Sequence, residues 1–325
     1  IDPVSYNTTN TTWGLPAAGV TFATLGTAQT VTLSGGIDDQ PTDAVTVNAW
    51  SYFANADEVD VSLLITGPAS VTVQQTALTI ASSRKDCIAF ISPPSANVVN
   101  QAGNETTNIT SWVNALATTT SYAVADCGWK YMFDKYNNIY RWIPLNGDIA
   151  GTCVYTDSVR DPWFSPAGYN RGNLKNVVKL AWNPSKAQRD ILYPLGVNPV
   201  ATFPGQGTLL FGDKTFLNQP SAFDRINVRR LFIVLEKAIA TASKFSLFEF
   251  NDDFTRNQFV ALVTPYLRDV QGRRGITDFR VVCDTTNNTP QIIDSNQFVG
   301  DIYIKPARSI NFIQLNFVAV RTGVS

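Results

Sequence analysis

The stretch VDVSLLITGPASVTVQQTALTIASSRKDCIAFIS, residues 59–92, decides the fold class of this chain. It opens with an apolar run of strand length over residues 59–66, which Gly67 and Pro68 close. Residues 71–82 then carry the spacing of a helix, and a second apolar run of strand length covers residues 86–92. Short apolar strands that alternate with helices form βαβ units, whose strands are parallel. The stretch therefore predicts an α/β fold with a mainly parallel sheet.

The same alternation extends outward from this stretch. Further helices are predicted over residues 41–53, 106–117, 146–159 and 184–193, and further strands over residues 122–125 and 174–182. Two aromatic-rich runs flank Asn137-Asn138 within residues 128–144, which predicts a β-hairpin. Residues 194–207 are rich in Pro and Gly and are interpreted as a link. We expect one α/β domain over residues 31–210, preceded by a linker or edge-strand segment at residues 1–30.

The last third of the chain predicts a smaller α+β domain over residues 211–325, with a soft boundary near residues 205–218. Its helices are expected over residues 224–243 and from Asn251 or Asp252 onward, where an N-cap stands before acidic residues of the first turn. Its strands are expected over residues 276–284, 298–305 and 309–320.

The overall composition excludes several classes of function. The chain has 25 basic and 26 acidic residues, a net charge of −1, which argues against a nucleic-acid partner. It has no histidine, so Ser-His-Asp and Cys-His catalysis and His-based metal sites are excluded. No apolar run approaches the roughly 18 residues that a membrane span needs. The four cysteines, which have no CxxC spacing, are expected to be buried free thiols.

No cofactor is expected, because the short motifs that suggest one have simpler explanations. The acidic pairs Asp38-Asp39 and Asp252-Asp253 are interpreted as turn and N-cap residues rather than as paired catalytic acids. The GQG sequence at residues 205–207 does not lead from a strand into a helix with phosphate-loop spacing, so it is interpreted as a turn.

The helix expected over residues 224–243 carries a group of basic residues with two open interpretations. They are either an ordinary solvated face or an electrostatic contact with another protein, and they are Arg225, Arg229, Arg230, Lys237 and Lys244. Exposed charge contacts are modest and screened by salt.

The strand expected over residues 309–320 also has two interpretations. Its faces alternate and both are partly apolar, and it stands at the end of the sequence; the residues that mark it are Ser309, Ile310, Phe312, Ile313, Leu315, Phe317 and Val318. It is either a strand of its own domain or a strand that adds to the sheet of another subunit.

Several blocks resemble phage contractile-tail sheath proteins, above all those of T-even-type phages. They occur in matching order from about residue 31 onward, and they are DPWFSPAGYNRGNLKNVVKLAW (residues 161–182), SAFDRINVRRLF (221–232), FEFNDDFTRNQF (248–259), RVVCDTTNNTP (280–290) and IYIKPARSINFIQLNFVA (302–319).

The resemblance implies a structural subunit rather than an enzyme. Such subunits stack as hexameric rings in a helical sheath around the tail tube, and contraction drives the tube through the host envelope. The family implies a middle α/β domain compared in fold to subtilisin and a C-terminal domain that faces the tube. It also implies terminal arms that add strands to neighbouring subunits, as well as baseplate and tail terminator partners. The expected location is the virion tail, and the host cytoplasm during assembly.

Two departures from the family are expected to matter. The sequence begins with Ile1 and lacks the family's N-terminal portion, and it stops slightly short at Ser325, so it is interpreted as a fragment. The alternative function is a cytosolic α/β enzyme of unknown reaction.

Overall fold

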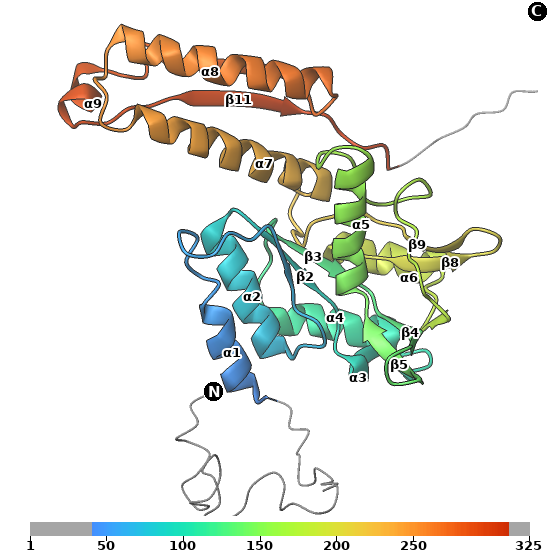
Figure 1. Ribbon diagram of the computed structural model, residues 1–325. Helices are drawn as coiled ribbons and strands as arrows, with labels where there is room; N and C mark the ends of the chain where they lie inside the picture. The colour runs from blue at the N-terminus through green and yellow to red at the C-terminus, as the bar shows by residue number, and fades with distance from the viewer. Residues whose placement is uncertain (1–40, 312–325) are drawn as a thin grey trace, which may run out of the picture. The chain divides into compact units, whose positions relative to one another are not determined.

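The computed structural model describes residues 41–311 of the chain (Figure 1). Contacts divide the chain after Pro41, and the elements given below belong to the unit formed by residues 42–325. The linker or edge-strand segment expected at residues 1–30 lies outside the described residues.

A four-stranded parallel sheet lies at the centre of residues 42–216. Its strands follow the order β1, β2, β3, β7, with bounds Leu63–Ile65, Ile88–Ile91, Ala123–Asp126 and Val197–Asn198. The register pairs Leu64 with Ala89, and Phe90 with Val124. All residues of β2 and β3 are buried, as expected of parallel strands covered on both faces.

Helices accompany this sheet, and side-chain caps mark the start of α1, α2 and α6. They are α1 (Asp43–Ser51), α2 (Val71–Arg84), α3 (Ser95–Val98), α4 (Glu105–Leu116), α5 (Asn146–Val159) and α6 (Lys186–Leu192). The hydroxyl of Ser70 accepts from the Val73 backbone N–H and caps α2. Between α2 and α4, the Trp112 Nε1 donates to Gln74 Oε1 at 2.8 Å inside the core.

The hairpin predicted around Asn137-Asn138 is confirmed. Strands β4 (Trp129–Asp134) and β5 (Ile139–Pro144) pair antiparallel, and Asn138 takes a φ of 54° in the turn. The long strand predicted over residues 174–182 is wrong, because only β6 (Lys179–Leu180) pairs with β4. Asn176 has a φ of 56°, which interrupts extended backbone just before β6.

The interpretation of residues 194–207 as a link is also wrong. After the short 3-10 turn η3 (Tyr193–Leu195), the segment supplies β7 and then β8 (Val200–Phe203), which forms a hairpin with β9 (Gly207–Leu210). Val197 and Val200 are fully buried. Strand β7 extends the parallel sheet with only two buried residues. A strand of this length is shorter than any apolar run that a sequence pattern can detect.

The remaining elements form an α+β arrangement with its own core. They are α7 (Ile226–Ser243), η4 (Lys244–Ser246), α8 (Asp253–Gly272), β10 (Ile276–Val282), α9 (Pro290–Asp294) and β11 (Asp301–Pro306). Strands β10 and β11 pair antiparallel beside the two long helices (Figure 1). The carboxylate of Asp252 accepts from the Thr255 N–H at 2.9 Å, which confirms the predicted cap. The second core contains Leu231, Leu267 and also Trp163 from the preceding region.

The structure is therefore mixed α/β, as predicted. The strand expected from Ser309 does not begin there, since residues 309–311 are irregular, and residues 312–320 lie outside the described part of the chain. Within residues 41–311, none of the helices combines the length and apolar character that crossing a membrane would require.

Candidate functional site

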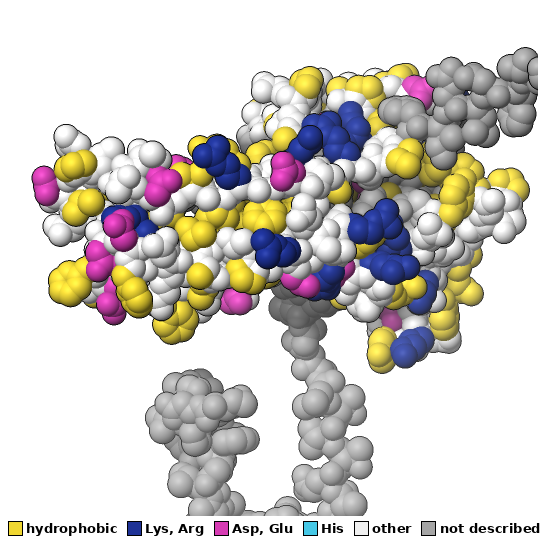
Figure 2. All heavy atoms as spheres, turned by 90° about the horizontal axis from the view of Figure 1, so that it is seen from above, with side chains coloured by type: hydrophobic (Ala, Val, Ile, Leu, Met, Phe, Trp, Pro, Cys, Tyr) yellow, Lys and Arg dark blue, Asp and Glu magenta, His cyan; other side chains and the backbone are white. Residues whose placement is uncertain are grey.

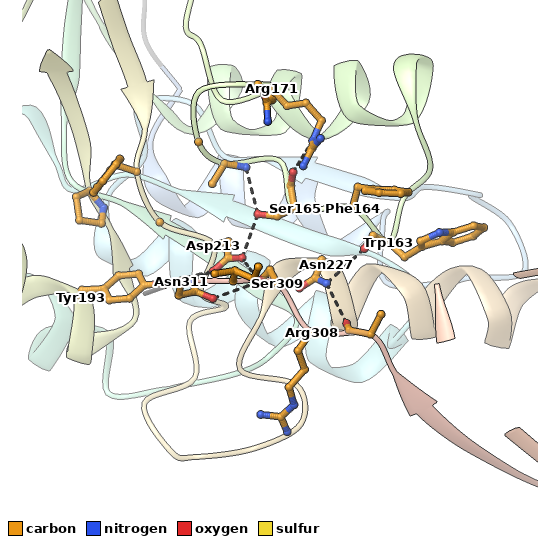
Figure 3. A pocket seen from close by; sticks show the side chains of 18 of the residues that line it. Trp163, Phe164, Ser165, Arg171, Tyr193, Asp213, Asn227, Arg308, Ser309 and Asn311 are labelled. Atoms are coloured by element: carbon orange, nitrogen blue, oxygen red, sulfur yellow. Dashed lines mark hydrogen bonds between the residues drawn. The ribbon is translucent and has the colours of Figure 1, made fainter. Parts of the chain in front are cut away.

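A cavity of about 1340 Å³ lies where several parts of the chain meet. They are the loop at residues 163–171, α6 with Tyr193, Pro199, residues 211–213, the first turn of α7, the end of α8 with the residues that follow it, and residues 307–311 (Figure 3). The cavity is thus bordered by both hydrophobic cores, and it stands at the point where the chain continues toward residue 312.

One buried carboxylate, that of Asp213, collects the polar groups of this cavity. It accepts hydrogen bonds from the Oγ of Ser309 at 2.7 Å, the Nδ2 of Asn311 at 2.8 Å and the Oγ of Ser165 at 3.0 Å. Figure 3 shows these three side chains converging on it. Asp213 is only 2% exposed. It therefore fastens residues 309–311 to the body of the protein.

Asp213 also forms a buried ion pair. The Nη1 of Arg225 lies 3.0 Å from its Oδ1, and the Tyr193 hydroxyl, which accepts from the same guanidinium at 2.6 Å, donates to that oxygen at 3.3 Å. Burial alone would raise the pKa of Asp213, but the hydrogen bonds from Ser309 and Asn311 and the charge of Arg225 outweigh it, and the pKa is lowered. The carboxylate is therefore ionised at neutral pH.

The loop that supplies Ser165 is held by close backbone packing. The Arg171 Nε donates to the Ser165 carbonyl at 2.8 Å. A Cβ placed on Gly172 would lie 2.7 Å from the Gly168 nitrogen and 2.9 Å from the Leu210 carbonyl oxygen. Only glycine fits there, which gives a packing reason for the glycine that ends the DPWFSPAGYNRG segment.

Asn227, 4% exposed, joins the two sides of the cavity. Its Nδ2 donates to the Trp163 carbonyl at 3.3 Å and to the Ala307 carbonyl at 3.5 Å (Figure 3). Its Oδ1 is buried and has no hydrogen-bond partner within residues 41–311.

The rim of the cavity is basic. Five basic residues line it against two acidic ones, Asp190 and Asp213; the basic ones are Arg171, Lys186, Arg189, Arg274 and Arg308. Asp213 is neutralised by Arg225, and none of the five basic side chains makes an ion pair within the described residues. The cavity therefore favours an acidic occupant.

The predicted basic face of α7 is wrong for two of its members. Arg229 and Arg230 are 5% and 7% exposed. The Arg229 guanidinium lies over the rings of Tyr122 and Phe223, at 4.1 and 3.9 Å, and donates to the Ser121 Oγ. Planar guanidinium groups tolerate such burial because they stack on aromatic rings.

Arg230 is buried in a different way. Its Nη2 lies 2.5 Å from Asp157 Oδ2, and its Nη1 donates to the Cys153 carbonyl, so that it joins α7 to α5. Helix α7 packs against α5 at this position. The helix face that carries Arg229 and Arg230 is therefore buried rather than exposed to solvent.

The other three predicted contact residues are more open. Arg225 belongs to the Asp213 cluster, and the Nζ of Lys237 lies 2.7 Å from Asp60 Oδ1. Lys244 is exposed in η4. The structure thus gives the five residues five different surroundings rather than one basic surface.

Of the residues that marked the terminal strand, two are described. Ser309 bonds to Asp213, and Ile310, 83% exposed, lines the cavity. The others lie outside the described residues, and they are Phe312, Ile313, Leu315, Phe317 and Val318.

The carboxyl ends of the parallel strands hold no exposed catalytic group. Asp126, at the end of β3, accepts from the Ser92 Oγ at 2.6 Å and the Gly128 N–H at 2.9 Å. Ser92 and Asp126 are 2% and 1% exposed. Burial raises the pKa of Asp126 to about 8. The pair is satisfied internally, so it offers no nucleophile to a substrate.

The thiols and carboxylates show no other reactive arrangement. Each of the four cysteines is a buried free thiol, as predicted, and burial raises the pKa of Cys127 to about 12. In the part of the chain that the structure describes, no group of three or more Cys, Asp or Glu side chains is placed to hold a metal ion.

Sequence reasoning missed Asp213, Tyr193 and Asn311 as members of one cluster. Ser165 lay in a loop rich in Pro, Gly and aromatic residues, a composition typical of binding surfaces. Asp213 follows Phe211-Gly212 in a stretch with no periodicity, so no local pattern marks it.

Two family models match the chain in the order of its elements. The phage tail sheath protein central domain matches residues 43–216, and the phage tail sheath C-terminal domain matches residues 218–319. The chain belongs to the phage tail sheath protein family. The segments that join at the Asp213 cavity are thus contributed by both sheath domains.

Individual sheath relatives agree with this assignment. The chain is 53% identical over 265 residues to the tail sheath protein of Vibrio phage KVP40, covering 77% of this chain and 40% of that protein. It is 46% identical over 311 residues to the tail sheath protein of Enterobacteria phage T4, covering 90% of this chain and 47% of that protein. The chain therefore spans less than half the length of these sheath proteins.

Solved sheath structures share the fold. The sheath complex of an extracellular contractile injection system, PVC, in its contracted state gives a TM-score of 0.69 at 20% identity, over 87% of this chain and 82% of that one. The contracted helical sheath of the anti-feeding prophage gives 0.68 at 19% identity, over 86% of this chain and 83% of that one.

Proposed function

We propose that this chain belongs to a structural subunit of a contractile tail sheath. The subunit polymerises around a tail tube as stacked hexameric rings, and contraction of the sheath drives the tube through the host envelope. Membership of the sheath family supports the structural role. The observation that carries the proposal is the attachment of residues 309–311 to buried Asp213, directly before the segment that was expected to exchange between subunits. A segment that transmits force needs such a fixed base.

The finer features of the proposal follow the family resemblance. The central domain has a subtilisin-like fold built on its parallel sheet, and the C-terminal domain faces the tube; the two divide near residues 205–218. The family-model bounds at residues 216 and 218 support this division. The residues that follow Asn311, up to residue 320, donate a strand to a neighbouring subunit, and Asp213 fixes the irregular residues 309–311 that precede it. Lys244, which is exposed, remains the candidate for an electrostatic contact with the tube.

The proposed partners are further copies of the subunit, the tail tube protein, and baseplate and tail terminator proteins. The proposed location is the virion tail, reached from the host cytoplasm where assembly takes place. Electron microscopy of the concentrated protein, with and without tail tubes, tests the proposal. Tubular polymers of regular helical repeat are expected. A protein that stays monomeric at all concentrations, both alone and beside tubes, contradicts it.

A further inference from the structure

The connection between α7 and α8 forms an exposed aromatic tip. We define the α7–α8 tip as residues 245–254, FSLFEFNDDF. Five of its ten residues are large and apolar, and all five are exposed: Phe245 85%, Leu247 62%, Phe248 105%, Phe250 84% and Phe254 76%. Such a concentration of exposed aromatic side chains marks an interaction surface.

The α7–α8 tip is also acidic. It contains Glu249, Asp252 and Asp253 and no basic residue. Asp253 pairs with Arg256 of α8 and Asp252 caps that helix, so Glu249 is the carboxylate of the tip that makes neither contact within residues 41–311. Figure 2 shows acidic and hydrophobic side chains together at this end of the helix pair, and basic side chains gathered toward the other end. The cavity around Asp213 has the opposite character, with five basic residues on its rim and the rings of Trp163, Phe164 and Phe211 in its lining. Charge and apolar surface are therefore complementary between the two.

A single molecule cannot join the two surfaces. The cavity is lined by Asn227 at the start of α7 and by Arg274 just after α8, whereas the tip lies at the opposite ends of both helices. Helix α8 has 20 residues. It is therefore about 30 Å long, which keeps the tip far from the cavity of its own chain.

We propose that the α7–α8 tip of one copy docks in the Asp213 cavity of another copy. The proposal rests on the proposed function, because it assigns an interface to the self-assembling subunit. Its contacts pair Phe248 and Phe250 with the aromatic lining and Glu249 with Arg274 and Arg308. Because tip and cavity are different surfaces, the contact is head-to-tail and repeats into an open array.

Other segments of this chain complement the cavity less well. Residues 312–325 contain one basic residue, Arg321, and no acidic residue. Residues 1–40 contain three acidic residues, but Asp2 stands far from Asp38 and Asp39, and no aromatic residue lies between positions 23 and 40. Residues 52–58 also combine exposed aromatic and acidic side chains, but with two rings, Tyr52 and Phe53, against four phenylalanines in the tip.

Cross-linking between engineered cysteines tests the contact. The native thiols are buried, so a short thiol-specific cross-linker will select Phe250→Cys in the tip and Ile310→Cys at the cavity. We expect no product from either single variant, a dimer from their mixture, and a ladder from the double variant. The absence of the mixed dimer overturns the proposal, as does a dimer formed instead between Asp39→Cys and Ile310→Cys. The proposal is also overturned if Phe250→Cys cross-links to a cysteine of added tube protein instead of to Ile310→Cys.

Assembly measurements complement the cross-links. Phe248→Ser with Phe250→Ser is expected to raise the critical concentration for assembly about 30-fold or more, as loss of a buried aromatic contact does. Tyr136→Ser, which removes an 87% exposed ring on the β4–β5 hairpin, is the matched control and is expected to change nothing.

A charge exchange gives the most specific readout. Glu249→Arg and Arg308→Glu are each expected to weaken assembly about fivefold, and both changes in one chain are expected to restore it. Normal assembly by the tip variants, in a protein that does form tubes, overturns the tip contact and leaves the proposed function intact. If the unaltered protein forms no tubes, the proposed function fails, while the mixed cross-link still decides the tip contact.

Discussion

The Oγ of Ser309 donates a hydrogen bond of 2.7 Å to the carboxylate of Asp213, which precedes it by 96 residues. This bond joins the sheath C-terminal domain to the central domain, three residues before residue 312. Ser309, Asn311 and Ser165 each donate a side-chain hydrogen bond to the Asp213 carboxylate. The guanidinium of Arg225 balances its negative charge. The cluster is therefore the natural place to test how the two domains are held together.

Replacing Asp213 with Asn is expected to lower the free energy of unfolding by about 3 kcal/mol, because Arg225 loses its buried partner. Ser309→Ala, which removes one donor, is expected to cost about 1 kcal/mol. Urea denaturation at pH 7 measures both. Since the folded pKa of Asp213 is depressed, its contribution is present above the unfolded pKa of 3.8 and is lost as pH falls through the folded value. The difference between Asp213→Asn and the unaltered protein should therefore shrink below about pH 4; a pH-independent difference contradicts the assignment.

Replacing Asp126 with Asn is expected to change the pH dependence of stability in the opposite sense. Burial raises the folded pKa to about 8, so the contribution of this group is fully present below its unfolded pKa of 3.8 and is lost as pH rises toward 8. The variant has no such group, so its stability relative to the unaltered protein should increase by about 1.4 kcal/mol per pH unit in that window. Denaturation at pH 5, 6 and 7 measures it. Parallel profiles for the two proteins would show that Asp126 is ionised when folded.

Arg229→Glu is expected to weaken folding rather than only a surface contact. The guanidinium lies between Tyr122 and Phe223, so the change buries an unpaired carboxylate and should cost about 3 kcal/mol or more. Lys244→Glu on the exposed end of the same region is the control and should change stability by no more than about 0.5 kcal/mol. Thermal unfolding compares them. Equal melting temperatures would mean that Arg229 is solvated.

Gly172→Ala is expected to destabilise the cavity loop by about 2 kcal/mol, since the new Cβ would overlap backbone atoms of Gly168 and Leu210. Gly151→Ala in α5 is the matched control. No heavy atom lies within 4 Å of a Cβ built there, and alanine should stabilise the helix by about 0.5–1 kcal/mol. Chemical denaturation of the two variants should move the midpoint in opposite directions.

Phe317→Pro is expected to disrupt assembly if residues 312–320 pair with a neighbouring subunit, because proline removes one ladder donor. Phe317→Leu keeps the backbone N–H and should assemble normally. Sheath length in electron micrographs is the measurement. Sheaths of normal length and stability from the proline variant would exclude strand exchange through this segment.

The sequence alone determined the features that depend on neighbouring residues. Apolar runs such as residues 86–92 predicted buried strands, and Asp252 predicted the start of α8, because burial pattern and capping act within a few residues. The pattern failed for β7, whose two residues are stabilised by pairing with β3 rather than by any run of their own.

Tertiary structure alone decided which polar groups meet. Arg229 contacts Ser121 across 108 residues, and Asp213 contacts Ser309 across 96. Helical spacing indicated where Arg229 stands on α7, but a periodic pattern does not reveal which element will pack against that face. Burial then changes the physical role of a charge, since a guanidinium removed from water has to be satisfied by partners that only the fold brings close.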